Sequence, residues 1–274
     1  MAILDLRVRY FQDSTPVDVP CREENFVHRH IRMPLPLSQT ALVLVDVWNV
    51  HFIESWIERA ERITQESILP ILDTARQCKR NGERVTIVHA PSPPVAAQFE
   101  QLARHQKNPS VQPAGSPTDW PPTQFRQRSD EYQIFRGPRS QPPGIDVHWN
   151  KLASQLSISP QIEVKPEEEV IATGQQLHQL LAERQILHLI YVGFATNWCV
   201  LGRDYGIRAM AGRGYNIILL REATTGVEFP DTLDETFTTE IAVREVEQQY
   251  GFTASNKDFF QACLSDNEGK CLTG

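Results

Sequence analysis

Short apolar runs alternate with helical patterns along this chain, and this alternation is the feature that most limits its fold. Residues 41–45, Ala-Leu-Val-Leu-Val, form one such run, and residues 186–192 form another. A strand that is apolar at successive positions is buried on both faces, whereas a half-exposed strand is apolar only at alternate positions. Buried strands joined by helices form a parallel sheet that is covered on both sides. The sequence therefore predicts an α/β fold.

The other expected elements repeat this order. We expect strands at residues 41–45, 84–89, 161–165, 186–192, 215–220 and 252–255. We expect helices at residues 52–81, interrupted before Pro70, and at 174–184, 199–212 and 231–250, the last with Asp231 or Thr232 as its cap.

Two segments do not fit the alternation. Residues 1–40 are rich in charge and proline, and we expect an extended N-terminal arm there. Residues 91–160 hold many prolines and polar residues, which predicts a proline-rich insertion with a short helix near 96–106, acting as a lid or a subunit contact. The main domain then spans residues 41–260, and residues 261–274 form a polar tail.

Composition argues against several classes of protein. The net charge of −7 and the isoelectric point near 5.6 do not fit a nucleic-acid binder, which normally presents a basic face. No apolar run approaches the roughly 20 residues that cross a bilayer, and residues 1–10 lack the apolar core of a signal peptide. The 5 cysteines form no Cys-x-x-Cys pair, which argues against a disulfide framework or a zinc knuckle. We therefore expect a cytoplasmic protein with no membrane or nucleic-acid partner.

Three chemically distinct side chains fall at expected strand ends. Asp46 follows the first strand, Lys165 closes the third, and Cys199 comes just after the fourth and next to a helix start. Parallel α/β sheets bind ligands at this edge, and a helix start favours a thiolate. Singly, the aspartate has an ordinary explanation as a turn residue, the lysine as a solvated charge and the cysteine as a small buried apolar residue. Together, the three predict a catalytic site.

The residues around these positions resemble a known family, the isochorismatase-like cysteine hydrolases. Residues 41–46 resemble the first strand of the family, and residues 193–200, Gly-Phe-Ala-Thr-Asn-Trp-Cys-Val, resemble its nucleophile turn. Lys165 matches the family lysine, with Thr173 and Leu177 downstream, although the Pro-Glu-Glu that follows Lys165 departs from the usual Ser/aromatic pattern.

The resemblance covers roughly residues 40–255 and implies a three-layer α/β/α fold with a six-stranded parallel sheet. It also implies a Cys–Asp–Lys triad, here Cys199, Asp46 and Lys165, that hydrolyses C–N bonds of small amides, ureido and carbamoyl compounds. The thiol attacks, the aspartate moves the proton, and the lysine stabilises the charges. By the same resemblance, the backbone N–H groups of Ala195 and Cys199 form the oxyanion hole, with a cis peptide bond between Phe194 and Ala195.

Substrate-binding candidates are the polar and aromatic residues beside the triad. They are Trp48, Asn49, His51, Phe52, His89, Phe194, Thr196 and Trp198. Two of them have structural alternatives: His89 as a hydrogen-bonded strand-end histidine, and Trp48 as a packing residue in place of a glutamine common in the family. Phe125, Tyr132 and Phe135 are weaker candidates for closing the site from the insertion.

No metal or other cofactor is expected. The sequence after His89 lacks the Asp-x-His pattern with which nicotinamidases of this family hold a metal, and His28 and His30 have no matching carboxylates. The resemblance implies a homo-oligomer, either a dimer or a tetramer, that acts on a small molecule. Two alternatives to the amide hydrolase stay open: a vinyl ether hydrolase of the isochorismatase type, which typically lacks the cysteine, and a catalytically silent binding subunit.

Overall fold

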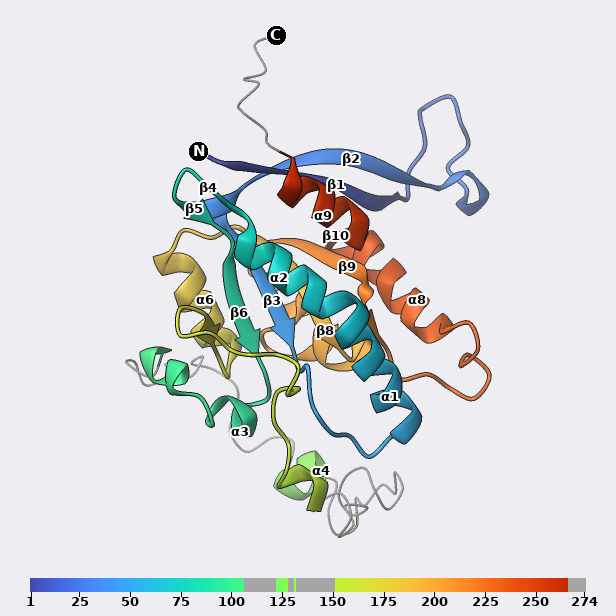
Figure 1. Ribbon diagram of the computed structural model, residues 1–274. Coiled ribbons are helices and arrows are strands. Elements are labelled where there is room, and N and C mark those ends of the chain that lie inside the picture. The colour runs from blue at the N-terminus through green and yellow to red at the C-terminus, as the bar shows by residue number, and fades with distance from the viewer. Residues whose placement is uncertain (106–121, 128–130, 132–150, 266–274) are drawn as a thin grey trace.

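A mixed sheet runs through the centre of the computed structural model, which describes residues 1–105, 122–127, 131 and 151–265 (Figure 1). The strand order is β2-β1-β10-β9-β8-β3-β6-β7. Six strands are parallel: β10 (Gly251–Ala254), β9 (Asn216–Thr225), β8 (His188–Phe194), β3 (Thr40–Val45), β6 (Thr86–Ala90) and β7 (Glu169–Val170). The predicted α/β fold is confirmed, and its parallel part matches the expected strand number.

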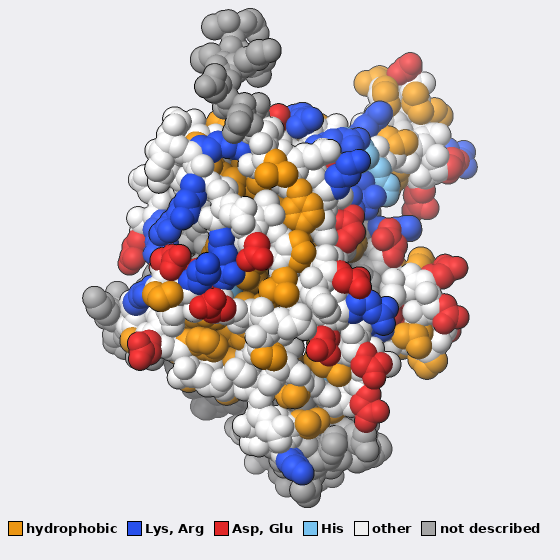
Figure 2. Space-filling view, viewed as in Figure 1, with side chains coloured by type: hydrophobic (Ala, Val, Ile, Leu, Met, Phe, Trp, Pro, Cys, Tyr) orange, Lys and Arg blue, Asp and Glu red, His pale blue; other side chains and the backbone are white. Residues whose placement is uncertain are grey.

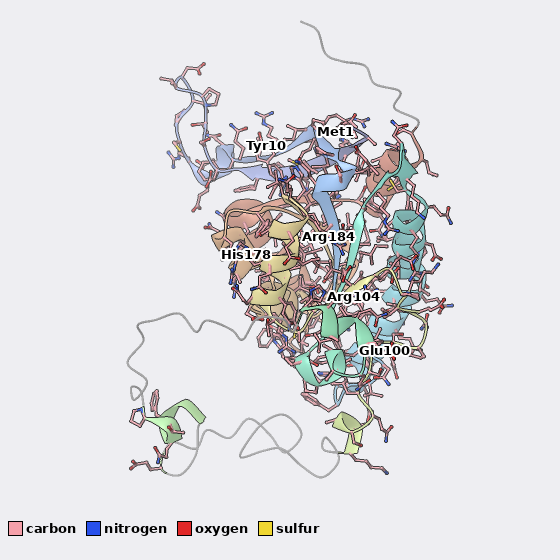
Figure 3. The ribbon with its side chains drawn as sticks, turned by 90° about the vertical axis from the view of Figure 1, so that its left-hand side faces the viewer. Met1, Tyr10, Glu100, Arg104, His178 and Arg184 are labelled. Atoms are coloured by element: carbon pink, nitrogen blue, oxygen red, sulfur yellow. The ribbon has the colours of Figure 1, made fainter. Side chains whose placement is uncertain are left out.

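The sheet has eight strands rather than six, because the N-terminal segment adds two. β1 (Ile3–Gln12) and β2 (Val27–Pro36) are antiparallel to each other, and β1 joins β10. Met1 and Tyr10 lie near opposite ends of β1 (Figure 3). Alternate β1 side chains (Leu4, Leu6 and Val8) are fully buried, so the strands at 3–12 and 27–36 are part of the sheet.

Helices cover both faces of the sheet. On one face lie α1 (Glu54–Ile63), the π-helix η3 (Thr64–Ile68), α2 (Leu69–Gln77) and α9 (Asn256–Leu264). On the other face lie α6 (Gly174–Glu183), α7 (Ile207–Gly212), α8 (Phe237–Glu245) and the π-helix η7 (Val246–Tyr250). Over the face that carries α1 and α2, acidic and basic side chains are mixed (Figure 2).

Strand side chains divide between two apolar cores. In β3, Leu42 and Leu44 pack in the core under α1 and α2, whereas Ala41, Val43 and Val45 pack under α6 and α7. This division explains why the run is apolar at every position, since both faces of the strand are buried.

Short elements complete the described chain. They are η1 (Glu23–Asn25), η2 (Leu37–Gln39), β4 (Lys79–Arg80), β5 (Glu83–Arg84), α3 (Pro93–Ala96), η4 (Glu100–His105), α4 (Thr123–Gln127) and η6 (Thr196–Val200). Within the described residues, no helix combines the length and apolar character needed to cross a bilayer. Most of the proline-rich insertion, including Tyr132 and Phe135, lies outside the described residues.

The strand predicted at residues 161–165 does not form. The parallel strand in this region is β7, which begins four residues after Lys165. Pro160 and Pro166 flank the segment, and proline cannot donate to a strand ladder. Side chains bind this backbone instead: Glu163 O accepts a 2.6 Å bond from Arg76. Lys165 is therefore in a loop before a strand, and not at the end of one.

Two predicted helices are shorter than expected. The one at 199–212 is split by the turn at 203–206, and α7 begins only after it. The helix predicted at 231–250 begins at Phe237. Its cap is Glu228 rather than Asp231 or Thr232. The Glu228 carboxylate accepts hydrogen bonds from the backbone N–H groups of Thr238 and Thr239, at 2.8 and 2.9 Å.

Candidate active site

Asp46 is placed by the close approach of two strand ends. It directly follows β3, is 1% exposed and has a left-handed φ of 44°. On the neighbouring strand β8, Gly193 has a φ of 113°, and an added Cβ would lie 2.0 Å from Val45 O. Only glycine tolerates this contact, which brings the segment after Gly193 against Asp46.

Cys199 lies in the π-helix η6, which follows β8 after one residue. The peptide bond between Phe194 and Ala195 is cis, as the resemblance implied. Ala195 O accepts hydrogen bonds from the N–H groups of Trp198 and Val200, at 3.0 and 3.1 Å, which closes the turn around the cysteine. The thiol is half-buried at the carboxyl edge of the sheet.

The thiol of Cys199 and the carboxyl of Asp46 are neighbours that change each other's pKa. Burial and the Asp46 charge raise the pKa of the Cys199 thiol to about 12. Burial also raises the pKa of Asp46, while the Arg203 guanidinium and the contact with Cys199 oppose this rise. At neutral pH the sulfur therefore keeps its proton, with a carboxyl group beside it to accept that proton.

Arg203 is the cation that contacts Asp46. Its Nε and Nη2 atoms each lie 3.0 Å from Asp46 Oδ2. The other carboxylate oxygen, Oδ1, is buried and has no partner of good hydrogen-bond geometry in the described part of the chain. The guanidinium thus holds one oxygen of the carboxylate and not the other.

Lys165 contacts Glu168 through its backbone, and within the described chain none of its hydrogen bonds is with Asp46, Cys199 or Arg203. Its N–H donates to Glu168 Oε2 at 3.1 Å, and its carbonyl accepts from Glu168 N at 3.0 Å. Among the described residues, the Lys165 ammonium has no carboxylate within 4.0 Å. The structure brings together two members of the expected triad, Cys199 and Asp46, and the catalytic role of Lys165 stays a prediction.

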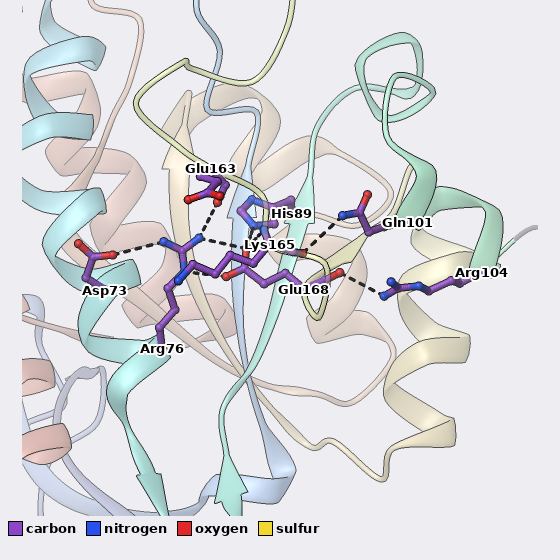
Figure 4. A network of polar contacts seen from close by, with 8 residues as sticks. All are labelled: Asp73, Arg76, His89, Gln101, Arg104, Glu163, Lys165 and Glu168. Atoms are coloured by element: carbon purple, nitrogen blue, oxygen red, sulfur yellow. Dashed lines mark hydrogen bonds and ion pairs between the residues drawn. The ribbon is translucent and has the colours of Figure 1, made fainter.

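His89 and Glu168 form a buried pair next to this loop (Figure 4). His89 Nε2 lies 2.8 Å from Glu168 Oε2, and Arg76 Nε donates to Oε1 at 2.7 Å. Burial alone would raise the pKa of Glu168, but hydrogen bonds from His89 and Arg76 lower it to about 2. His89 therefore has a structural partner, as in the alternative interpretation, and its contact with substrate stays a prediction.

The next carboxylate in the chain, Glu169, forms a second buried cluster. It binds His105 at 3.1 Å, Arg104 at 3.6 Å and also Arg184. Arg104 and Arg184 come from η4 and from the end of α6 (Figure 3). In the two clusters, both Glu168 and Glu169 are paired with basic side chains. The described residues contain no group of three or more His, Cys, Asp or Glu side chains arranged for a metal ion.

Aromatic rings form a cluster that includes Trp198, the residue next to Cys199 in the sequence. His51 stacks on Phe52 with centroids 4.4 Å apart, lies 6.0 Å from Trp48 and 6.5 Å from Trp198. Trp56, which the sequence analysis did not select, packs on His51 at 4.5 Å. Burial lowers the pKa of His51 to about 4, so this ring is neutral at neutral pH. The predicted binding residues 48, 51, 52 and 198 thus form one aromatic cluster.

Three other predicted binding residues have structural contacts. The Asn49 side chain bonds to Gln155 O and Ser157 N, at 3.0 and 2.8 Å. Thr196 Oγ1 bonds to Thr224 at 2.7 Å, and Phe194 packs edge-on against Trp56. These contacts connect the turn to its surroundings, and contact of these residues with substrate stays a prediction.

Arg203 and Glu168 contact predicted site residues, Asp46 and His89, and the sequence analysis did not select them. Arg203 is four residues after Cys199, and its N–H bonds to Cys199 O at 3.0 Å, as one helical turn requires. That spacing was the available signal. Glu168 carried no comparable signal, because its partner His89 is 79 residues away.

A family model, the Isochorismatase domain, matches residues 40–251. The chain belongs to the isochorismatase family. This match covers the strands β3 to β9, the Asp46 position and the nucleophile turn. Among curated proteins, none matches the sequence of the chain.

Solved structures similar to this chain are also known. A cysteine hydrolase from Pseudomonas syringae pv. phaseolicola 1448A is 15% identical, with a TM-score of 0.51 over 85% of this chain and 96% of that one. An isochorismatase family protein from Burkholderia thailandensis is 16% identical, with a TM-score of 0.48 over 84% and 100% of the two chains. A nicotinamidase from Staphylococcus aureus is 15% identical, with a TM-score of 0.38 over 79% and 96%. At 15% identity, the likeness to the cysteine hydrolase supports the fold alone.

Proposed function

We propose that this family member is a cysteine hydrolase that cleaves a C–N bond of a small amide, ureido or carbamoyl compound. The observation that carries the proposal is the contact between the Cys199 thiol and the buried Asp46 carboxyl at the carboxyl edge of the sheet. A thiol with its own proton acceptor is the arrangement that nucleophilic catalysis needs.

The proposed reaction begins as Asp46 accepts the thiol proton while the sulfur attacks the carbonyl or carbamoyl carbon. The tetrahedral intermediate then collapses: the C–N bond breaks, and Asp46 returns the proton to the departing nitrogen as ammonia or an amine leaves. Water, activated by Asp46, attacks the thioester, and the acid leaves as the thiol is restored. In this proposal, the backbone N–H groups of Ala195 and Cys199 donate hydrogen bonds to the oxyanion of the tetrahedral intermediate. Lys165 stays a proposed third member of the triad.

The concerted proton transfer follows from the resting state of the pair. Because burial and the Asp46 charge hold the pKa of the thiol near 12, free thiolate is rare at neutral pH. Transfer to Asp46 during attack avoids a separate charged intermediate in a desolvated site. The aromatic cluster beside the turn supplies an apolar wall for a small planar group.

The test is release of ammonia or amine across a panel of small amides, ureas and carbamoyl acids. We expect turnover of at least one compound and a loss of about 10³-fold or more in Cys199→Ala and Cys199→Ser. Cys21→Ser, at an exposed cysteine, serves as the matched control and keeps full activity. Peptide mapping after iodoacetamide treatment reports whether Cys199 reacts.

Three outcomes separate the hypotheses. Retained turnover in Cys199→Ala, on a vinyl ether substrate, favours the ether hydrolase. Failure of the whole panel, with no labelling of Cys199 in folded protein, contradicts the enzyme proposal and favours a binding subunit. The homo-oligomeric state and the cytoplasmic location also stay predictions, and light scattering measures the former.

A further inference from the structure

We propose that Arg203 is the positioning residue that fixes the Asp46 carboxylate beside Cys199, a charge role that the family resemblance assigns to a lysine. The inference rests on the proposed cysteine hydrolase function and deepens it. It names which cation of this chain sets the chemistry of the nucleophile pair.

The first argument is the geometry of the ion pair. Both Nε and Nη2 of Arg203 lie 3.0 Å from the same atom, Asp46 Oδ2. Asp46 is 1% exposed, so this contact compensates a charge that water cannot reach. Holding one oxygen leaves the second, Oδ1, without a conventional hydrogen bond among the described residues. That free oxygen is the atom suited to take the thiol proton.

The second argument is that the turn carrying Arg203 is fixed on several sides. Arg203 N bonds to Cys199 O at 3.0 Å, and Arg203 O accepts from Gly206 N at 2.8 Å. The Asp204 side chain accepts from Gly174 N at 2.7 Å, at the start of α6. Tyr205 O accepts from the buried Tyr191 hydroxyl at 2.8 Å. A guanidinium on such a turn holds the carboxylate with little freedom.

The third argument is the contrast with Lys165. Its peptide group is bonded to Glu168, and its ammonium has no ion pair within 4.0 Å in the described parts of the chain. The ion pair that a triad lysine would form with Asp46 is formed by Arg203 instead.

The charged and titratable groups around the thiol define the expected response. Asp46 at the end of β3 raises the pKa of Cys199, and Arg203 lowers it. Tyr205 faces the same pair, with Asp204 beside it. Arg203 is one of the groups that lower the pKa of both Cys199 and Asp46, against the rise that burial causes. Removing the guanidinium therefore raises both pKa values.

The experiment measures the rate of Cys199 alkylation by iodoacetamide between pH 6 and 9, which needs no substrate. We expect Arg203→Met to slow alkylation about 10-fold for each unit of thiol pKa, and Arg203→Lys to restore much of the rate. Lys165→Met should change the rate less than Arg203→Met does. Arg208→Met is the matched control, because that arginine pairs with Glu245 on the surface, and it leaves the rate unchanged.

Equal rates in Arg203→Met and the parent, or a larger loss in Lys165→Met, overturn the inference. If Arg203→Met does not fold, Arg203→Gln replaces it, because glutamine keeps hydrogen-bond donors without the charge. An alkylation rate equal to that of the parent would again overturn the inference. Where a substrate is known, the acid limb of kcat/KM should move to higher pH in the Arg203 variants. If the parent turns over no compound of the panel but Arg203→Met slows alkylation, only the proposed function is contradicted. If the parent turns over a substrate but Arg203→Met leaves the alkylation rate unchanged, only this inference is contradicted.

Discussion

The two buried carboxylates Asp46 and Glu168 have opposite electrostatic environments. Burial raises the pKa of Asp46, because one guanidinium does not fully compensate the lost solvation. Burial would also raise the pKa of Glu168, but His89, Arg76 and the Lys165 N–H hydrogen-bond to it and lower the pKa to about 2. Asp46 is thus suited to proton transfer, and Glu168 is suited to a permanent ion pair.

Glu168 should account for part of the acid sensitivity of folding. Its folded pKa of about 2 lies below the ordinary value of 4.5, so its stabilisation is present above pH 4.5 and is lost as the pH falls toward 2. The shift corresponds to about 3 kcal/mol. In Glu168→Gln, the free energy of unfolding at neutral pH should fall, and its loss between pH 4.5 and 2 should be shallower than in the parent. Urea unfolding at several pH values measures both.

Glu167→Gln is the matched control for this measurement, because Glu167 is exposed and next in sequence. It should leave the pH profile of the parent unchanged. If Glu168→Gln and the parent lost stability in parallel below pH 4.5, the ion pair would not have the strength assigned to it here.

At the scale of elements, the turn of the candidate site depends on contacts between segments that only glycine permits. Gly174 begins α6, where the Thr173 side chain and Gln176 form a capping box. A Cβ on Gly174 would lie 1.9 Å from Asp204 O, in the turn that carries Arg203. The start of α6 therefore sets the position of that turn.

Gly174→Ala should lower stability and the reactivity of Cys199 together. The clash with the Asp204 backbone must be relieved by moving one of the two segments, at a cost of about 1–3 kcal/mol. Displacement of Arg203 should also slow alkylation of Cys199. Gly212→Ala in α7, where an added Cβ meets nothing within 4 Å, is the control and should be neutral or stabilising by up to about 1 kcal/mol. Thermal unfolding and alkylation rates, compared between the two variants, test this; equal behaviour would count against the coupling.

At the scale of the whole molecule, the N-terminal hairpin extends one apolar core. The buried β1 side chains pack in the same core as Phe259 of α9. Arg9 of β1 and His28 of β2 both bind the buried Glu247 of η7, at 2.6 and 2.9 Å. The hairpin is thus bound by apolar packing and by buried charge.

Truncation of a buried β1 side chain should therefore cost as much as a mutation in the central sheet. Leu6→Ala, at a fully buried position, should lower the free energy of unfolding by about 2–5 kcal/mol. Ile31→Ala on β2, where the side chain is 41% exposed, should change it by about 0.5 kcal/mol or less. Urea unfolding followed by circular dichroism measures both, and a similar small effect of the two changes would indicate that the hairpin folds separately.

The sequence by itself determined the parallel sheet and the meeting of Asp46 with Cys199. Runs that are apolar on both strand faces require a covered parallel sheet, and in such a sheet the carboxyl ends of neighbouring strands meet at one edge. Asp46 and Cys199 follow β3 and β8, which are hydrogen-bonded neighbours, so their contact follows from local patterns and one topological rule.

Only the tertiary structure decided which cation and which carboxylate each buried group would pair with. Arg203 and Asp46 are 157 residues apart, and His89 and Glu168 are 79 residues apart. Such pairs depend on the path of loops and on side-chain direction, and hydrophobic periodicity predicts neither. The role of β1 and β2 was also decided by the tertiary structure. Both strands carry many charged residues, and the sequence did not indicate that alternate β1 residues extend the core. Local patterns therefore predicted the edge where Asp46 and Cys199 meet, and long-range packing selected Arg203 as the partner of Asp46.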